Sequence, residues 1–220
     1  MTRSDLINTI IRKHGYGSYL EIGLNTPRQP EWNWPHVEIA FKECVDPNVR
    51  ARATYPVTSD EFFAKHIKTK YDIVFIDGLH HSEQVYKDIV NSLKWLEEGG
   101  TIVVHDCNPP SERSQSREHV SGEWSGDVWK AFLKLRMENP DITMYTVDTN
   151  YGCGIIRKGH QELYVPEKGA ELEYAYFRKH DKEILNLVSV RQFKMKMGRF
   201  TIFDRVINKI KRMLGIKLNF

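Results

Sequence analysis

The sequence predicts a doubly wound α/β fold, in which helices cover both faces of a mostly parallel sheet. Short apolar runs typical of buried strands alternate with helix-period segments from residue 4 to about 139. Two further strand-like runs within 142–158, separated by a turn near Asn150, predict an antiparallel hairpin at the end of the sheet. In such a fold, ligands bind beyond the carboxyl ends of the parallel strands.

The first half of the chain is expected to supply a helix and three strands. Apolar residues repeat at helical spacing over residues 4–13, and Ser4 is the predicted N-cap. Strands are predicted at 18–24, within 37–46 and at 73–76, with a short helix at 61–68. The segment 27–36 holds three prolines and two tryptophans, so we expect a loop there, with Trp32 and Trp34 either in the core or in a pocket wall.

The second half begins with the clearest helical pattern in the chain. Apolar residues recur on one face over 82–98, and two glycines follow, which predicts a helix ending at that pair. A buried strand is predicted at 101–106 and a helix over 126–140. The long polar loop at 109–125 between them is either a lid over the acceptor site or a surface excursion.

The composition favours one cytoplasmic domain with an appended segment. The chain has 220 residues and a formal net charge of +3, and we divide it into a Rossmann-like domain at 1–160 and a helical, basic extension at 161–220. The first residues alternate polar and apolar too often for a signal peptide. No apolar run approaches the roughly 18 residues that a membrane-spanning helix needs. The three cysteines form no C-x-x-C pair, which argues against a zinc ribbon or a disulfide framework.

Positive charge is concentrated in the C-terminal tail, residues 180–220. A protein that reads nucleic acid would spread basic residues over its body, so we expect no nucleic-acid partner. Residues 203–214 place apolar side chains on one face of a predicted helix, with lysine and arginine elsewhere. Such a helix either makes a peripheral contact with an anionic membrane or docks on its own domain or on a second subunit of a homo-oligomer.

Polar residues follow the strands at the predicted ligand-binding edge. They are Glu21 and Gly23 after the first strand, Asp46 after the second, Ser59 after the third region, Asp77 and His80 after the fourth, and His105 and Asp106 after the fifth. Because these points fall along one edge of a doubly wound sheet, we expect their side chains to converge above the apolar core.

The first of these groups suits a nucleoside. Asp46 lies about 23 residues beyond Gly23, the distance at which an acid can accept both hydroxyls of a ribose, and Gly23 lets the backbone approach the ligand closely. However, the segment EIGLNTPR at 21–28 is not G-x-G-x-x-G, so it lacks the glycines that let a pyrophosphate settle on a helix N-terminus. A dinucleotide is therefore disfavoured, and a nucleoside without phosphates, such as S-adenosylmethionine, fits better.

The second group suits a hard cation and a base. Asp77 and Asp106 end neighbouring strands, and two adjacent carboxylates repel unless a proton or a cation such as Mg²⁺ lies between them. His80 follows Asp77 by three residues, so a tight turn can aim its imidazole at the same point. A neutral histidine beside a divalent cation is a good general base for a hydroxyl.

Four segments carry a resemblance to a known family. YLEIG (19–23), CVDPN (44–48), YDIVFIDGLHHSEQVYKDI (71–89) and GGTIVVHDCNP (99–109) resemble the class I S-adenosylmethionine-dependent methyltransferases. Within that class they are similar to the branch of the macrocin O-methyltransferases and related sugar O-methyltransferases. The resemblance covers about residues 15–157.

This resemblance implies methylation of a sugar hydroxyl, in a glycan or a glycosylated metabolite. It implies that the cofactor is held by Glu21, Gly23, Asp46 and Asp77, with Ser59 beside the adenine. It also implies that Asp77 and Asp106 bind Mg²⁺ and that His80 is the base, with Asp77 as its catalytic partner.

Other interpretations stay open for several of these residues. Asp77 can cap the helix that starts near Ser82, and Ser82 can itself be the N-cap. His105 either makes a hydrogen bond in the core or joins the metal shell. Tyr151 can line the acceptor site, and His81 is either structural or solvated.

Two other functions stay open for the chain as a whole. The Asp77, His80 and Asp106 cluster could activate a water in a metal-dependent hydrolase. Alternatively, the chain could be a non-catalytic, methyltransferase-like assembly subunit anchored by its tail.

Overall fold

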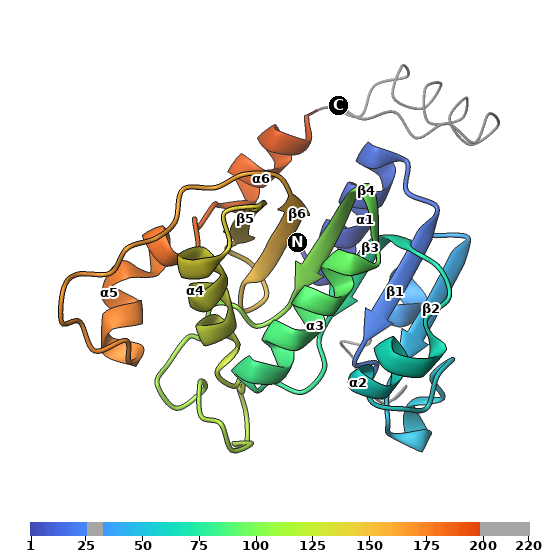
Figure 1. The fold of residues 1–220 in the computed structure, drawn as a ribbon, viewed down its shortest axis with the longest axis horizontal. Coiled ribbons are helices and arrows are strands. Elements are labelled where there is room, and N and C mark those ends of the chain that lie inside the picture. Colours follow the sequence, from blue (N-terminus) through green and yellow to red (C-terminus); the bar gives the residue numbers. More distant parts are fainter. Residues whose placement is uncertain (26–32, 199–220) are drawn as a thin grey trace.

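A six-stranded mixed sheet forms the centre of the molecule (Figure 1). The computed structural model describes residues 1–25 and 33–198. The strands are β1 (Ser18–Ile22), β2 (Phe41–Val45), β3 (Tyr71–Ile76), β4 (Leu96–Val104), β5 (Ile142–Val147) and β6 (Cys153–Lys158). Their order is β2-β1-β3-β4-β6-β5; the first four are parallel, and β6 is antiparallel to both of its neighbours. The predicted Rossmann-like α/β fold with a C-terminal antiparallel hairpin is confirmed.

Helices cover both faces of this sheet, with α3 and α4 on one face and α1 on the other (Figure 1). The α-helices are α1 (Arg3–His14), α2 (Ser59–Glu61), α3 (Ser82–Lys94), α4 (Val128–Glu138), α5 (Tyr174–Ile184) and α6 (Val190–Met197). Shorter helical turns are η1 (Trp34–His36), η2 (Val49–Ala51) and the π-helical η3 (Phe62–His66). In the described part of the C-terminal region, α5 packs against α4, where Phe177 stacks on Trp129, and α6 packs against α1, where Phe193 joins the core.

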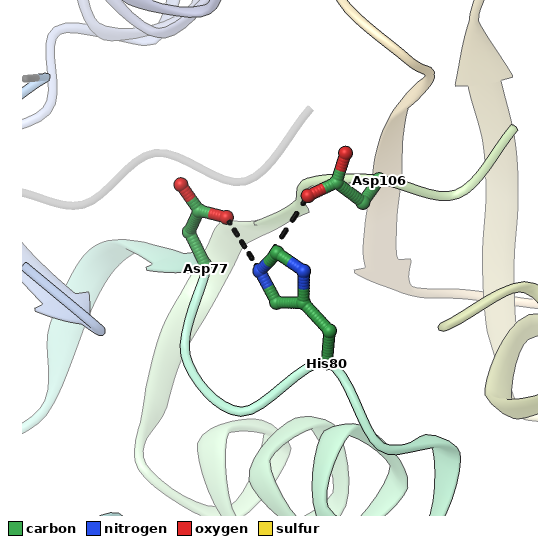
Figure 2. Close-up of side chains that lie close together, drawn as sticks. All are labelled: Asp77, His80 and Asp106. Carbon is green, nitrogen blue, oxygen red and sulfur yellow. Dashed lines mark ion pairs between the residues drawn. The ribbon is translucent and has the colours of Figure 1, made fainter. Parts of the chain in front are cut away.

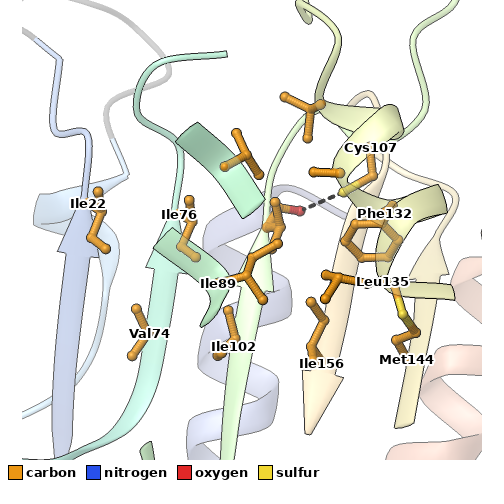
Figure 3. Close-up of a cluster of buried hydrophobic side chains, with 14 of the residues drawn as sticks. Ile22, Val74, Ile76, Ile89, Ile102, Cys107, Phe132, Leu135, Met144 and Ile156 are labelled. Carbon is orange, nitrogen blue, oxygen red and sulfur yellow. Dashed lines mark hydrogen bonds between the residues drawn. The ribbon is translucent and has the colours of Figure 1, made fainter. Parts of the chain in front are cut away.

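The core has two layers because the strands are apolar on both faces. In β3, Val74 and Ile76 pack under α3 and α4, whereas Ile73 and Phe75 pack under α1. Successive side chains of a strand point to opposite faces, so a sheet covered on both faces needs an almost continuous apolar run. Figure 3 shows the first layer, in which side chains of the sheet, such as Ile76 and Ile102, lie beside Ile89 of α3.

Two predicted helix boundaries are wrong. The N-cap of α1 is Thr2 rather than Ser4: the Thr2 hydroxyl accepts from the Asp5 amide at 3.1 Å, and Asp5 accepts from the Thr2 amide in return. Helix α3 ends at Lys94 rather than at the glycine pair, and the chain turns into β4 from Leu96. Leu96 is fully buried opposite Tyr71 of β3, so tertiary pairing outweighs the local helical pattern.

The start of α3 also differs from both interpretations of its cap. Ser82 is the first residue of the helix, and its amide donates to Asp127 Oδ1 at 2.6 Å. An amide at the N-terminus of α3 is therefore hydrogen-bonded by Asp127, which is distant in the sequence, and Asp77 is not needed as a cap.

Some predicted features lie outside the described residues. These are Trp32 and the amphipathic tail helix at 203–214. Across residues 1–25 and 33–198, no helix combines the length and apolar character needed to cross a bilayer.

Gly23 is where the first strand meets the third most closely. Its φ is +84°, and a Cβ built there would lie 2.2 Å from the carbonyl oxygen of Asp77. We expect Gly23→Ala to lower the free energy of unfolding by roughly 3 kcal/mol or more, because backbone would have to move. Gly169 is the matched control: its φ is +80°, and nothing lies within 4 Å of the position that a Cβ would take there.

Gly169→Ala should therefore lower the free energy of unfolding by only about 1 kcal/mol, which is the cost of the left-handed conformation for a residue with a Cβ. Urea denaturation of both variants measures the difference. Equal losses would contradict a steric contact between Gly23 and Asp77.

Candidate active site

A cavity of about 1090 Å³ lies over the carboxyl ends of the parallel strands. The strand order places Asp46, Gly23, Asp77 and Asp106 in a row along this edge, and Tyr151 follows in the β5–β6 turn. Every site residue predicted from the sequence lines the cavity: Glu21, Gly23, Asp46, Ser59, Asp77, His80 and Asp106. The structure therefore brings residues at the carboxyl ends of β1 to β4 together with Ser59 of α2.

Asp77, His80 and Asp106 form a compact cluster in the middle of the row (Figure 2). His80 Nε2 lies 3.3 Å from Asp77 Oδ1 and 3.5 Å from Asp106 Oδ2. One donor atom from each of the three residues lies within 4.8 Å of the others. This spacing is suited to binding one cation or to exchanging a proton.

The backbone at Asp106 is held in an uncommon conformation. Its φ is +61°, in the left-handed region that non-glycine residues rarely adopt. The next two amides are fixed by the hairpin turn: Cys107 N donates to Gly152 O at 3.0 Å, and Asn108 N donates to Tyr151 O at 2.8 Å. The turn therefore sets the direction in which the Asp106 side chain points.

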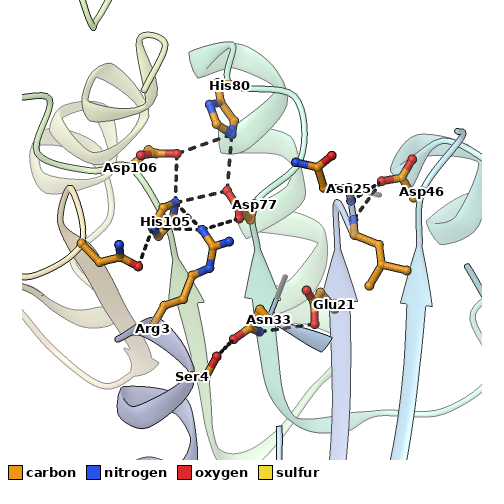
Figure 4. A network of polar contacts seen from close by, with 12 residues as sticks. Arg3, Ser4, Glu21, Asn25, Asn33, Asp46, Asp77, His80, His105 and Asp106 are labelled. Carbon is orange, nitrogen blue, oxygen red and sulfur yellow. Dashed lines mark hydrogen bonds and ion pairs between the residues drawn. The ribbon is translucent and has the colours of Figure 1, made fainter. Parts of the chain in front are cut away.

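His105 belongs to the same cluster (Figure 4). It is 4% exposed, and its Nδ1 lies 2.9 Å from Asp106 Oδ2 and 3.3 Å from Asp77 Oδ1. The histidine that the sequence left between a core hydrogen bond and the metal shell is thus a direct neighbour of both carboxylates.

Arg3 is the residue of the cluster that sequence reasoning missed. Its Nη1 lies 3.2 Å from Asp77 Oδ2, and the same atom lies 3.4 Å from His105 Nε2. Arg3 stands in the first turn of α1, whose apolar pattern predicts only a docked helix. No local signal in the sequence relates it to Asp77, 74 residues later in the numbering.

These contacts shift the protonation of the cluster. Burial favours a higher pKa for Asp77, but the charge of His105, hydrogen bonds from both histidines and the charge of Arg3 outweigh it and lower that pKa. Burial lowers the pKa of His80, but its hydrogen bond with Asp77 and the charge of Asp106 raise it overall. The pKa of His105 is likewise raised, against its burial, by Asp106 and Asp77. Asp77 thus stays ionised, and Asp77 and Asp106 together raise the pKa of both imidazoles.

The carboxylate of Asp46 already accepts hydrogen bonds from three backbone amides. Its Oδ2 accepts from Leu24 N at 2.8 Å and from Asn25 N at 3.0 Å, and its Oδ1 accepts from Asn48 N at 2.7 Å. Since a carboxylate oxygen accepts about two hydrogen bonds, only Oδ1 keeps an open position among the described contacts. As placed here, Asp46 can take one ribose hydroxyl, where the sequence predicted two.

Glu21 is buried beside this position. Its Oε2 accepts from the Tyr19 hydroxyl at 2.6 Å and from Asn33 Nδ2 at 3.4 Å. Burial raises its pKa to about 8, although both hydrogen bonds favour the charged form. Ser59 starts α2 on the other side of the cavity, where its hydroxyl accepts from Gln84 Nε2 at 3.2 Å.

Aromatic residues close the end of the cavity near β4. The ring of Trp124 stacks on His80 at a centroid distance of 4.7 Å, and His119 packs against the indole at 4.9 Å. The Tyr151 hydroxyl donates to Glu123 Oε1 at 3.2 Å. The loop at 109–125 therefore contributes cavity wall, and Tyr151 lines it too. Trp34, by contrast, packs against Tyr19 at the margin of the core.

A family model supports an interpretation of this edge as a catalytic site. Residues 7–107 match the model described as "Methyltransferase domain". These residues, which make up just under half of the chain, are therefore similar to that family. The match includes β1 to β4 and the Asp77, His80 and Asp106 cluster, whereas the 109–125 loop and the hairpin lie beyond it.

Solved methyltransferase structures share the fold at low sequence identity. A Staphylococcus aureus protein, provisionally described as a caffeoyl-CoA O-methyltransferase, is 16% identical, with a TM-score of 0.54 over 71% of this chain and 82% of that chain. SAH-bound PaMTH1 of Podospora anserina is 14% identical, with a TM-score of 0.51 over 71% and 77%. The O-methyltransferase TomG of Streptomyces achromogenes, in complex with SAM, is 14% identical, with a TM-score of 0.50 over 71% and 79%.

The raised pKa of Glu21 predicts a pH-dependent stability. An unfolded glutamate releases its proton near its ordinary pKa of 4.5, whereas folded Glu21 keeps it up to about 8. The folded state therefore binds more protons in this window, and the contribution of Glu21 to stability is lost as pH rises from about 4.5 to about 8. We expect Glu21→Gln to remove this pH dependence. Between pH 5 and 8 the free energy of unfolding of the variant should therefore rise by a few kcal/mol relative to that of the wild type.

Urea unfolding of both proteins at several pH values measures the difference. Parallel stability curves would show that Glu21 is not protonated in the folded state.

Proposed function

We propose that this chain is an S-adenosylmethionine-dependent O-methyltransferase whose acceptor is a sugar hydroxyl. The observation that carries the proposal is the position of the cluster. His80, between Asp77 and Asp106, lines a cavity whose strand ends match a methyltransferase family model, with residues suited to a nucleoside on one side and an aromatic wall on the other.

The residues at the β1 and β2 side fit an adenosyl cofactor. Asp46 has an open acceptor position for a ribose hydroxyl, and Ser59 lies across the cavity where the adenine would be placed. The carboxylates along the edge also favour a sulfonium, which carries a positive charge. Two of the structures with this fold, TomG and PaMTH1, contain SAM or SAH, which supports the same cofactor here.

The chain's own residues supply the proton chemistry. S-adenosylmethionine, when bound, supplies an electrophilic methyl group. His80 accepts the proton of the acceptor hydroxyl as the oxygen–methyl bond forms and the methyl–sulfur bond breaks. Asp77 and Asp106 stabilise the imidazolium that results, because both carboxylates lie within 3.5 Å of His80 Nε2. Alignment of hydroxyl, methyl and sulfur over the sheet edge would supply much of the acceleration.

We also propose that the cluster holds Mg²⁺ during this step. Asp77 and Asp106 would be its ligands, because carboxylate oxygens are donors that Mg²⁺ prefers, and His80 would stay available as the base. Such an ion would lower the pKa of the acceptor hydroxyl. Arg3 already pairs with Asp77, so guanidinium and metal would compete for that carboxylate.

The sugar acceptor rests on two arguments. A cation held by Asp77 and Asp106 could coordinate two oxygens on adjacent carbons, and sugars carry such pairs of hydroxyl groups. The segments 71–89 and 99–109 also resemble those of sugar O-methyltransferases. We further propose that the amphipathic segment 203–214, which lies outside the described residues, provides a peripheral membrane contact or a contact with a second subunit.

Substitution of His80 tests the reaction. His80→Ala should lower kcat by roughly 10²- to 10⁴-fold, because the general base is lost, while the Kd for S-adenosylhomocysteine stays within about threefold, because the nucleoside side is untouched. The neighbouring His81 does not line the cavity, so His81→Ala should keep its activity. Transfer of labelled methyl to a panel of glycosides and isothermal titration with S-adenosylhomocysteine give the two readouts.

Each alternative function has its own signature in this experiment. A wild-type protein that fails to bind S-adenosylhomocysteine would favour the metal-dependent hydrolase. A wild type that binds it, with a His80→Ala variant that keeps the biological phenotype, would favour the non-catalytic subunit.

Substitution of Arg3 tests the metal. Arg3→Met should tighten Mn²⁺ binding by roughly tenfold or more, because a positive charge that competes for Asp77 is removed. Arg12 of the same helix, half-exposed beside Glu38, is the matched control, and Arg12→Met should leave the Kd unchanged. Isothermal titration with Mn²⁺ measures both. An unchanged or weaker affinity in Arg3→Met would contradict a shared site on Asp77.

A further inference from the structure

We propose that the cavity contains an acceptor subsite, formed by His119, Glu123, Trp124 and Tyr151, that binds an uncharged glycosyl ring and rejects phosphorylated acceptors. This inference rests on the proposed function and goes further by assigning residues and a charge class to the acceptor. All four residues lie beyond the segment that matches the methyltransferase family model.

The position of these residues follows from the strand order. The nucleoside side is formed after β2 and β1, the cluster after β3 and β4, and Tyr151 comes from the turn that leads into β6, on the far side of β4. Trp124 reaches the same end from the 109–125 loop and stacks on His80. A ligand held there is next to the base and away from Asp46.

The side chains match the two kinds of surface that a sugar presents. The rings of Trp124 and Tyr151 offer apolar area for the C–H face of a pyranose. The Glu123 carboxylate accepts from the Tyr151 hydroxyl at 3.2 Å and has further acceptor positions for sugar hydroxyls. The indole is fixed in place, because its Nε1 donates to Ser116 O at 2.8 Å.

Charge selects against anionic acceptors. Among the described lining residues, seven carboxylates face one guanidinium: Glu21, Asp46, Asp60, Asp77, Asp88, Asp106 and Glu123, with Arg3. Arg3 is itself paired with Asp77.

The cavity stays negative when protonation is taken into account. Glu21 keeps its proton near neutral pH, which leaves six carboxylates against Arg3 and the proposed Mg²⁺, so negative charge is still in excess. The lining of the described residues includes no lysine that could bind a phosphate. A sugar phosphate, a sugar nucleotide or a coenzyme A thioester would therefore meet like charge, whereas an uncharged glycoside would not.

The test compares matched probes on the full chain. The probes are methyl hexopyranosides and the corresponding hexose 1-phosphates, each measured in the presence of S-adenosylhomocysteine by ligand-observed NMR, and as acceptors with S-adenosylmethionine. The wild type should bind at least one methyl hexopyranoside and prefer it at least tenfold over its phosphorylated counterpart.

Variants of the loop identify the residues that discriminate. Glu123→Gln should raise KM for the glycoside about tenfold with little change in kcat, and Glu123→Lys should reduce the discrimination against the phosphate at least fivefold. Trp124→Ala should raise KM strongly, and Trp124→Phe should restore part of the loss. Glu118, exposed on the same loop and outside the cavity lining, is the matched control, and Glu118→Gln should behave as the wild type.

The possible failures are distinguishable. Binding of S-adenosylhomocysteine without any binding of a methyl hexopyranoside, or a preference for the 1-phosphate, overturns the subsite and leaves the methyltransferase proposal standing. Loss of S-adenosylhomocysteine binding in all five variants, Glu118→Gln included, would reflect misfolding. The preference of the wild type for the methyl hexopyranoside over the 1-phosphate would then decide whether the subsite exists. A wild type that binds no S-adenosylhomocysteine overturns both proposals.

Discussion

The ionised carboxylate of Asp77, partly buried at the end of β3, is the constraint on which the rest of the site depends. A buried charge is strongly unfavourable unless it is paired and hydrogen-bonded. Asp77 is paired three times, with Arg3 of α1, His105 after β4 and His80 before α3. Each partner comes from a different element, so the ion pairs also fix how the first helix, the sheet edge and the turn into α3 meet. The chemistry proposed for His80 uses a geometry that the fold already needs to keep this charge inside.

The two sides of the cavity, on either side of that cluster, present different side chains. On the β2 side, backbone amides hold Asp46 and leave it one open acceptor position. On the β4 side, two rings and the carboxylate of Glu123 meet around the base. The first side lies within the part of the chain that matches the family model, and most of the second lies beyond it. Under the proposed function, the first side would hold the methyl donor and the second side the acceptor.

Local patterns in the sequence predicted the sheet and its polar edge well, and distant contacts account for what was missed. An apolar run followed by an acid marks the end of β3, and the parallel topology then places Asp46, Asp77 and Asp106 on one edge. The helical pattern through Leu96 misled because its partner, Tyr71, lies 25 positions earlier in the numbering. Arg3 and Trp124 carry no local signal, since their importance comes only from contact with Asp77 and His80 in the folded chain. The hydrogen bonds of Asp46 to Leu24 and Asn25 depend on a loop path that composition does not specify.

The β5–β6 turn has a consequence for how such a protein can diversify. The same few residues present the Tyr151 ring to the cavity and hold the backbone of Cys107 and Asn108, next to Asp106. At Gly152 a Cβ would lie 2.6 Å from the Asn108 amide, so even a small insertion or side chain there would displace the reactive centre. Mutations that tune selectivity through this turn would therefore carry a penalty in turnover. The 109–125 loop also lines the cavity, but the backbone hydrogen bonds that hold Cys107 and Asn108 come from the β5–β6 turn. Substitutions in the loop should therefore change the choice of acceptor with less effect on Asp106.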